Sequence, residues 1–324
     1  MRRDFSGRRQ FVTPVSVGTG QALEKTLQDA GLKAIIVSQP IFFTAGCAVE
    51  DFNWPDRIIL GTTSSEAVVA IKHIFHPLVM RGVPVIVTNH ATAELVREAA
   101  TAFVATKISF INELAGLCER VNGDAVHLSL ALGLDKKIGP RCLQAGASMG
   151  GLFAQSDMDS LASLAEQNQV PLKILTAARE VNQGFADGMA EKISFCLQSL
   201  QNKDVGILGL AFKPNTNSVA GSASIRLAQS LVSRGARVRA YDPVAMQDAK
   251  LELNGTVHYC ESPYAVAEGV EALVVRTGWP EFRALDFSKI KALLRRPLIV
   301  DTKNILDSTR LRAMGFEYVG VGRV

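Results

Sequence analysis

Strand-like segments occur near both ends of this chain and are almost absent from its middle. In the first part, the short runs FVTPVSV, AIIV, RIIL and VPVIV alternate with amphipathic stretches as far as Thr88. The alternation restarts at Asp204 with VGILGLAF, VRAYDP, ALVVRT and PLIVD. Strands that alternate with helices form parallel sheets covered by those helices. The sequence therefore predicts two α/β units separated by a helical segment.

The middle of the chain has the spacing of amphipathic helices. A continuous pattern from Thr92 to Cys118 is followed by a shorter helix from Asp124 to Leu132 and a helical block from Asp157 to about Gln201. The apolar positions of the first helix are Leu95, Ala99, Ala102, Phe103, Ile108, Ile111, Leu114 and Leu117. A helix of this length commonly bridges domains or subunits. We expect the protein to dimerise through it.

The first unit carries local helix signals. One helix ends at Gly31, and a second is predicted from about Ser64 to Arg81. Thr63 and Glu66 have the spacing of a capping box at the start of this second helix.

Composition excludes several classes of protein. The chain has 35 Lys and Arg against 31 Asp and Glu, and 48% of its residues are hydrophobic, as in globular proteins. The basic surplus is too small and scattered for a nucleic-acid surface, and no uncharged apolar run reaches the roughly 18 residues of a membrane span. The basic N-terminal decapeptide is interpreted as a solvated tail. Small molecules or proteins are the expected partners.

The cysteines indicate a reducing compartment. All five are spread singly without a CxxC pair, which argues against a disulfide framework or a metal site. We expect a cytoplasmic protein, with Cys142 as a buried structural thiol.

The dinucleotide fingerprint GxGxxG is not found. Gly18-Thr19-Gly20 comes closest, but Leu23 replaces the third glycine, and the segment is interpreted as an ordinary strand-to-helix turn. In the second unit, Gly206 and Gly209 lie inside the strand rather than after it.

The segment from Gly209 to Met246, GLAFKPNTNSVAGSASIRLAQSLVSRGARVRAYDPVAM, makes the chain recognisable. It resembles the C-terminal domain of the UDP-glucose/GDP-mannose dehydrogenase family, with its pattern GLAFKPNTDDVRESP followed by a helix and AYDP. The resemblance extends to VEDFNWPDRIILGT, ATKISFINELAGLCERVNGDAV, TGWPEFRALDF and DTKNILD. It implies enzymes that oxidise a UDP-sugar alcohol to a carboxylate in two NAD-linked steps, with a Cys nucleophile, and a role in polysaccharide biosynthesis.

The resemblance also implies that catalytic positions are substituted. Phe153 stands at the nucleophilic Cys, and Arg97 and Thr101 stand at the family's Lys and Asn. The other substituted positions are Ile41 and Ala45, for two Glu, and Pro14, for a Thr. Phe cannot form a covalent adduct, and Arg does not exchange protons as Lys does. Asp157 alone is retained, so we expect no catalytic residues.

The nucleotide-sugar side resembles the family more closely. Phe212 and Lys213 match the FK pair near the nucleotide sugar, and Gly150 and Gly151 match the glycines whose backbone approaches it. Two lysines replace family arginines. Lys303 stands where the family has the Arg of DGRN, and Lys137 stands where the family has an Arg that reaches a substrate bound in the neighbouring subunit. Both replacements keep charge and lose bidentate geometry.

The resemblance divides the chain into three domains. Residues 1–91 are expected to be a remnant of the NAD-binding domain, 92–201 a helical dimerisation domain, and 202–324 a UDP-sugar-binding domain. The fold class is α/β, with a partial Rossmann-like N-terminal lobe, a helical middle and a second Rossmann-like domain. Because only thirteen residues precede Pro14, the first half of the NAD-binding domain is expected to be missing.

The leading hypothesis is a non-catalytic homologue, without NAD, that binds a UDP-sugar or a full-length dehydrogenase partner and forms a homodimer or heteromer. The alternatives are an active NAD-dependent nucleotide-sugar dehydrogenase and a ligand-free scaffold. Any nucleotide is expected beside Phe212, Lys213 and Lys303, with no nucleic acid, membrane or metal involved.

Overall fold

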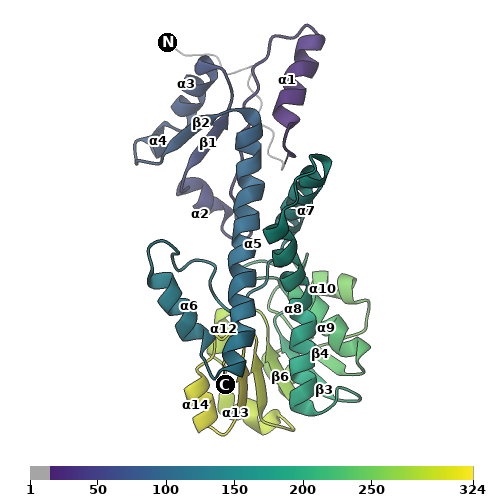
Figure 1. Cartoon of the computed structure of the whole chain (residues 1–324). Coiled ribbons are helices and arrows are strands. Elements are labelled where there is room, and N and C mark those ends of the chain that lie inside the picture. Colours follow the sequence, from purple (N-terminus) through teal and green to yellow (C-terminus); the bar gives the residue numbers. More distant parts are fainter. Residues whose placement is uncertain (1–14, 324) are drawn as a thin grey trace. The chain divides into compact units, whose positions relative to one another are not determined.

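The computed structural model describes residues 15–323, and the chain separates into two compact units, Met1–Ala100 and Thr101–Val324. Helix α5 (His90–Arg120) begins in the first unit and ends in the second (Figure 1). Within the described residues, no helix is long and apolar enough to span a membrane.

The first unit is built around two parallel strands. Its elements before α5 are α1 (Thr19–Asp29), α2 (Ala48–Asn53), β1 (Ile58–Gly61), α3 (Ser65–Ile74), α4 (His76–Val79) and β2 (Val85–Thr88). Ile58 pairs with Val85, and the register continues to Gly61 and Thr88. Ile58, Leu60 and Leu78 form a small buried core. RIIL and VPVIV form strands, as predicted: Ile58 and Leu60 lie in this core, and Val85 packs against it.

Four local predictions in this unit are wrong or lie outside the described residues. The AIIV segment is not a strand, because it meets β1 only through a single bridge from Ser38 to Gly61. The helix near Ser64 is two helices, α3 and α4, with Pro77 in the first turn of α4. Ser64 itself caps α3 by accepting a hydrogen bond from the backbone N of Ala67, so Thr63 is not the cap. Most of FVTPVSV lies outside the described residues.

The helical part of the second unit contains the rest of α5 with α6 (Ala125–Leu134), α7 (Leu152–Gln167) and α8 (Lys173–Leu197). Asp124 caps α6 by accepting hydrogen bonds from the backbone N of Val126 and His127. Ser109 on α5 donates to the carbonyl of Ala178 on α8 at 2.7 Å, which joins these two helices. Cys142 is exposed, so its prediction as a buried thiol is wrong.

The C-terminal part is a six-stranded parallel sheet with helical crossovers. Its elements are β3 (Asp204–Leu208), α9 (Ala223–Ser233), β4 (Arg237–Tyr241), α10 (Met246–Leu253), β5 (His258–Tyr259), α11 (Pro263–Ala267), β6 (Ala272–Val275), α12 (Pro280–Arg283), α13 (Phe287–Leu293), β7 (Leu298–Asp301), α14 (Ser308–Ala313) and β8 (Glu317–Gly320). The strand order is β5-β4-β3-β6-β7-β8, and every pairing is parallel. This is the doubly wound order that the fold prediction requires, and it reverses between β3 and β6.

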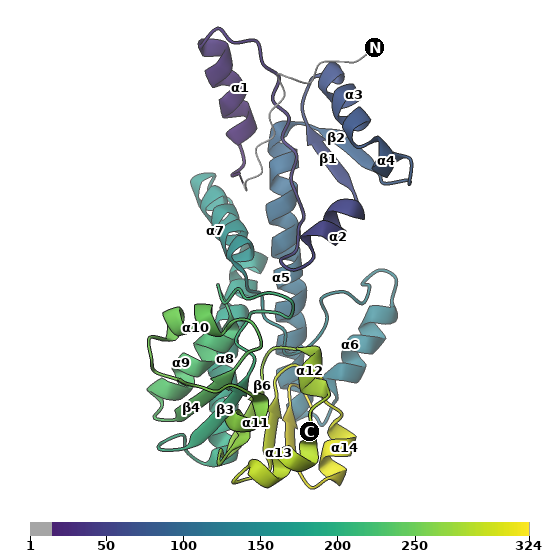
Figure 2. The same ribbon diagram turned by 180° about the vertical axis from the view of Figure 1, so that it is seen from behind.

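Burial explains why the central strands of this sheet are apolar. Strands β6 and β7 are buried along their whole length, as is β3 apart from Asp204, because helices cover them. Helix α8 packs along α9. Helix α11 packs on β3 and against α13, and Figure 2 shows α11 beside β6. Such continuous apolar strands are typical of sheets covered on both faces.

Candidate functional site

The carboxyl ends of three neighbouring strands carry the charged residues of the candidate site. Lys213 follows β3, Arg276 follows β6 directly, and Lys303 follows β7. Because all strands are parallel, these ends lie at one edge of the sheet, where the strand order reverses. That edge is where doubly wound sheets bind their ligands.

The predicted glycines meet the predicted phenylalanine at this edge. Gly151 has φ 94°, and a Cβ placed there would lie 3.1 Å from Cζ of Phe212. A Cβ at Gly150 would lie 2.9 Å from the carbonyl oxygen of Gly221. The backbone N of Gly151 also donates to the carbonyl of Ala220 at 2.8 Å. Glycine is therefore required here by close packing against the segment that follows β3.

Two buried or half-buried amides hold the loop of residues 146–151, which precedes α7. Asn112 accepts from the backbone N of Gly146 at 2.8 Å and donates to the carbonyl of Ala147 at 2.7 Å. Asn182 accepts from the backbone N of Met149 at 2.7 Å and donates to its carbonyl at 3.1 Å. The backbone N–H groups of Ser148 and Gly150 donate no hydrogen bond within residues 15–323.

Arg276 fixes the same loop from the sheet. It is 3% exposed, and it donates through Nη1 to the carbonyl of Gly146 at 3.3 Å and through Nη2 to Oγ of Ser148 at 2.7 Å. Its guanidinium carbon lies 5.3 Å from the ring centroid of Phe185. Burial, together with the nearby charge of Arg226, lowers the pKa of Arg276 to about 9. The guanidinium thus has hydrogen bonds but no ion pair with a carboxylate in the described residues.

Lys303 lies against the start of this loop. Gly146 has φ 87°, and a Cβ there would overlap the carbonyl oxygen of Thr302 and lie 3.4 Å from Cα of Lys303. Gln144 donates to the carbonyl of Lys303 at 3.1 Å. Burial lowers the pKa of Lys303 well below its usual value, Arg276 lowers it further, and Asp301 acts in the opposite direction. The Lys303 ammonium therefore stands in a cationic, partly desolvated environment.

Asp242, which follows β4, fixes the backbone that leads to Phe212 and Lys213. It is 1% exposed, and its Oδ2 accepts from the backbone N of Leu210 and Ala211 at 2.8 and 3.0 Å. The same oxygen accepts from Nε1 of Trp279 at 3.1 Å. A fully hydrogen-bonded buried carboxylate is a structural anchor, so Asp242 positions the segment after β3.

The retained Asp157 is hydrogen-bonded to one of the substituted positions. Thr101 on α5 donates to Oδ2 of Asp157 on α7 at 2.9 Å, and Asp157 is 6% exposed. Phe153, near the start of α7, is 56% exposed.

The remaining predicted positions lie elsewhere. Ile41, Ala45 and Arg97 belong to the first unit, where Ile41 and Arg97 are half-buried and Ala45 is exposed. Pro14 lies outside the described residues. Lys137 is exposed on the turn after α6, where its backbone N donates to Asp135.

The start of α1 does not fit the pyrophosphate of NAD. The backbone N of Gly18 and of Gly20 donate to the carboxylate of Glu94 at 2.7 and 2.8 Å. A Cβ at Gly20 would also collide with Ser38, His90 and Glu94. A carboxylate thus holds the amides that a phosphate would need, and its charge repels phosphate.

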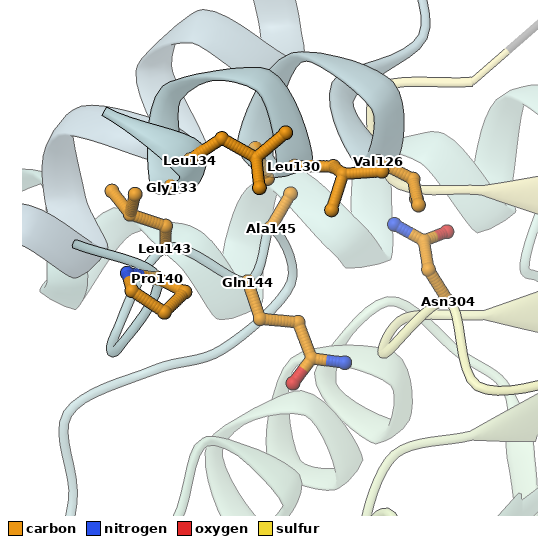
Figure 3. A pocket seen from close by; sticks show the side chains of 10 residues that line it. Val126, Leu130, Gly133, Leu134, Pro140, Leu143, Gln144, Ala145 and Asn304 are labelled. Atoms are coloured by element: carbon orange, nitrogen blue, oxygen red, sulfur yellow. The ribbon is translucent and has the colours of Figure 1, made fainter. Parts of the chain in front are cut away.

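A separate apolar pocket lies beside α6 (Figure 3). Its volume is about 270 Å³, and it is lined by Val126, Leu130 and Leu134 from the helix, by the segment from Pro140 to Ala145, and by Asn304. It contains few polar groups and no charged side chain. No group of three or more His, Cys, Asp or Glu in the described part of the chain could hold a metal ion.

Family models match two segments of the chain. Residues 206–308 match the UDP binding domain of the UDP-glucose/GDP-mannose dehydrogenase family, and residues 91–184 match its central domain. The chain is 37% identical over 298 residues to a UDP-glucose 6-dehydrogenase of Rickettsia bellii, covering 91% of this chain and 69% of that protein. The chain belongs to this dehydrogenase family.

Other members of the family give the same result. A UDP-glucose 6-dehydrogenase of Rhizobium meliloti is 36% identical over 314 residues, covering 95% of this chain and 72% of the relative. The solved structure of a UDP-glucose dehydrogenase from Pyrobaculum islandicum aligns with a TM-score of 0.86 and 32% identity, covering 96% of this chain and 69% of that one. The predicted family and α/β fold class are confirmed.

Sequence reasoning missed Arg276, Asn112 and Asn182. Arg276 had a signal, since it is the one charged residue in ALVVRT, at the end of an otherwise apolar strand. The two asparagines lie in ordinary helical patterns, and only their contacts with the loop distinguish them.

Proposed function

We propose that this dehydrogenase-family chain binds a UDP-sugar at the carboxyl edge of its six-stranded sheet. The observation that carries the proposal is the convergence of Lys213, Lys303 and the Gly150–Gly151 backbone on the strand ends where the order reverses. The match of residues 206–308 to a UDP binding domain supports uridine diphosphate as the nucleotide.

The chemistry of the edge suits a diphosphate. Two lysines supply positive charge, and the N–H groups of Ser148 and Gly150 have hydrogen-bonding capacity to spare. The lowered pKa of Lys303 means that a bound anion would relieve the repulsion it receives from Arg276. Charge-assisted hydrogen bonds contribute about 1.5–3 kcal/mol each, and ordering costs reduce the total, so we expect affinity in the micromolar range.

Oxidation of the bound sugar is the second candidate function. Similarity to relatives named UDP-glucose 6-dehydrogenase, over nine-tenths of the chain, supports NAD-dependent oxidation and favours it over the non-catalytic hypothesis. Phe153 at the position of the nucleophilic Cys argues in the opposite direction, because its side chain cannot form a covalent adduct. The start of α1 does not fit NAD, so no step of the reaction is derived from residues 18–20.

Calorimetry on the full chain tests the binding proposal. UDP and UDP-glucose should release or absorb heat with a saturable isotherm, and Lys213→Ala should weaken binding about tenfold or more. Lys33→Ala, which removes an exposed lysine of the first unit, is the matched control and should change nothing. Absence of binding by both uridine ligands would overturn the proposal and favour the scaffold hypothesis.

A spectrophotometric assay tests the second candidate. Formation of NADH from NAD that depends on UDP-glucose would establish oxidation, whereas binding of UDP-glucose without NADH would support the non-catalytic hypothesis. UDP-N-acetyl sugars and GDP-mannose extend the assay to the other nucleotide sugars.

We further propose that a second copy of the chain, or a full-length dehydrogenase, covers one stripe of α5. Phe103, Phe110 and Leu117 are 66%, 50% and 54% exposed, and they recur at intervals of seven residues. Large apolar side chains at this spacing form one face of a helix, and such exposed faces mark protein interfaces.

A further inference from the structure

A buried polar cluster joins α1 to the start of α5 within the first unit. Ser38, His90 and Glu94 are 8%, 6% and 4% exposed, and the side chain of Glu24 is 28% exposed. Oγ of Ser38 lies 2.7 Å from Nδ1 of His90 and 2.7 Å from Oε1 of Glu94. On the other side of the imidazole, Nε2 of His90 lies 3.1 Å from Oε1 of Glu24, at ion-pair distance but without the alignment of a hydrogen bond.

This cluster is the main attachment of α1 to the rest of the unit. Gly20 is the one buried residue of the helix, and a Cβ there would overlap Oγ of Ser38 and Nδ1 of His90. No residue of α1, which the structure describes in full, belongs to the apolar core around β1. A segment with so little apolar burial opens locally at a small cost once its polar contacts are lost.

The contacts of Glu94 fix the direction of the Ser38 hydroxyl. Glu94 accepts from the backbone N of Gly18 and of Gly20, and its Oε1 also accepts from Oγ of Ser38. An ionised carboxylate only accepts hydrogen bonds, so the single hydroxyl proton of Ser38 points to Glu94. Oγ of Ser38 is then an acceptor toward the imidazole, and Nδ1 of His90 must carry a proton.

The contact with Glu24 requires a second proton on the same ring. A lone pair on Nε2 of His90 would face a carboxylate oxygen at 3.1 Å and be repelled by it, whereas an N–H group would be attracted. If Nδ1 instead accepted from Ser38, the hydroxyl oxygen would face Glu94 at 2.7 Å without a proton between them. A neutral imidazole therefore leaves one repulsive contact in either tautomer, and only the imidazolium satisfies both sides.

The surroundings of the ring supply the countercharge. Within residues 15–323, the charged groups that face the imidazole are Glu24 on α1 and Glu94 on α5. On the side of β1, the backbone of Gly61 packs against Cα of His90 and brings no charge. His90 is the first residue of α5, so the helix dipole opposes the imidazolium. The two carboxylates offset both this dipole and the burial of the ring.

We propose that His90 is a proton-dependent switch that docks α1 onto α5 when its ring holds two protons and releases the helix when the ring holds one. The docked state binds one proton more than the undocked state, so docking is strongest at low pH and weakens as the pH rises. Histidine is the side chain whose charge ordinarily changes between about pH 5 and 8. The switch lies in the first unit and is independent of the UDP-sugar proposal.

Hydrogen exchange of the full chain, followed by mass spectrometry at about pH 6 and about pH 8.5, tests the switch across the range in which histidine titrates. Each rate is divided by the intrinsic rate of an unprotected peptide at the same pH. Protection of residues 19–29 should fall about tenfold or more between the two conditions, since one pKa unit between docked and undocked states corresponds to tenfold. Strands β1 and β2 should keep their protection. Equal protection of α1 at the two pH values overturns the proposal.

Glu24→Gln separates the switch from a merely structural contact. The Gln amide would donate to a neutral Nε2 of His90, so the repulsion at high pH disappears. Helix α1 should then be better protected than in wild type at about pH 8.5, and its pH dependence should be lost. Glu50→Gln, at an exposed acid of α2, is the matched control and should behave as wild type. A Glu24→Gln protein whose α1 is no better protected than that of wild type at the higher pH overturns the proposal.

The protonation state of the ring is measured directly by nitrogen NMR of histidine-labelled protein. The His90 signal is assigned by its shift in Glu24→Gln, and at about pH 6 both ring nitrogens should be protonated. A neutral His90 at that pH overturns the switch. His90→Gln should also abolish the pH dependence of α1 protection, whereas His127→Gln, at a side chain that is 80% exposed on α6, should retain it. Retention of the pH dependence in His90→Gln overturns the assignment to His90.

Discussion

Nη2 of Arg276 donates to Oγ of Ser148 at 2.7 Å across 128 positions of the sequence. The bond joins the end of a central strand to the loop that precedes α7, between a buried arginine and a half-buried serine. The geometry of the loop backbone therefore depends on a polar contact between two segments that are far apart in the chain.

Ser148→Ala should destabilise the protein by about 1–3 kcal/mol, because it leaves a buried guanidinium donor without its acceptor. Urea unfolding measures this free energy. Ser129→Ala is the control, since Ser129 donates to the carbonyl of Ala125 in its own helix, and should cost less than about 0.5 kcal/mol. Equal effects of the two substitutions would contradict the role given to Ser148.

Gly146→Ala should cost about 3 kcal/mol or more, since it combines a positive φ with an overlap of the new methyl group and the Thr302 carbonyl. Gly255→Ala is the matched variant, because Gly255 has φ 75° and open space around it. It should cost only the backbone strain of about 1–2 kcal/mol. A Gly146→Ala protein as stable as Gly255→Ala would refute the close approach.

Phe110→Glu should convert a dimer into monomers at micromolar concentration, because a carboxylate would be buried in the proposed α5 interface. Light scattering gives the mass. Leu251→Glu on α10, at a position that is 78% exposed, should keep the wild-type mass. A monomeric wild type would contradict the proposed α5 interface.

Stability should depend on pH through Asp204. Arg237 donates through Nε and Nη2 to the two carboxylate oxygens at 2.8 and 2.7 Å, and this hydrogen bonding lowers the pKa of Asp204 in spite of partial burial. A lowered folded-state pKa contributes stability above the unfolded-state value of 3.8, and that contribution is lost as the pH falls through the folded-state pKa. Arg237→Gln should therefore be less stable than wild type at neutral pH, with a difference that closes at strongly acidic pH. A difference independent of pH would exclude this ion pair as its cause.

Most of the second sheet follows from local sequence. The apolar runs at 205–208, 272–275 and 298–300 form buried strands, as predicted, because most side chains covered on both faces of a sheet are apolar. The prediction was wrong for AIIV, which is equally apolar, because a strand also needs a neighbour and this segment meets one only at Ser38.

The candidate site was likewise predictable from sequence only in part. Its glycines and the Phe212-Lys213 pair could be named from sequence, because motif resemblance fixes residue types at fixed spacing. The residues that they contact could not be named from sequence. In the sequence Gly146 is an ordinary loop glycine, and only the structure shows that the carbonyl of Thr302 packs against it.

The sequence by itself determined the alternation of strands and helices, the long α5 helix and the family, since these depend on side-chain periodicity and on residues that are close in the chain. Only the tertiary structure decided that β3 lies between β4 and β6, and that Arg276 at the end of β6 binds the loop of residues 146–151. Strand order and this contact arise from interactions between distant segments, whose free energy depends on burial and on the groups brought together. Local periodicity carries no information about either.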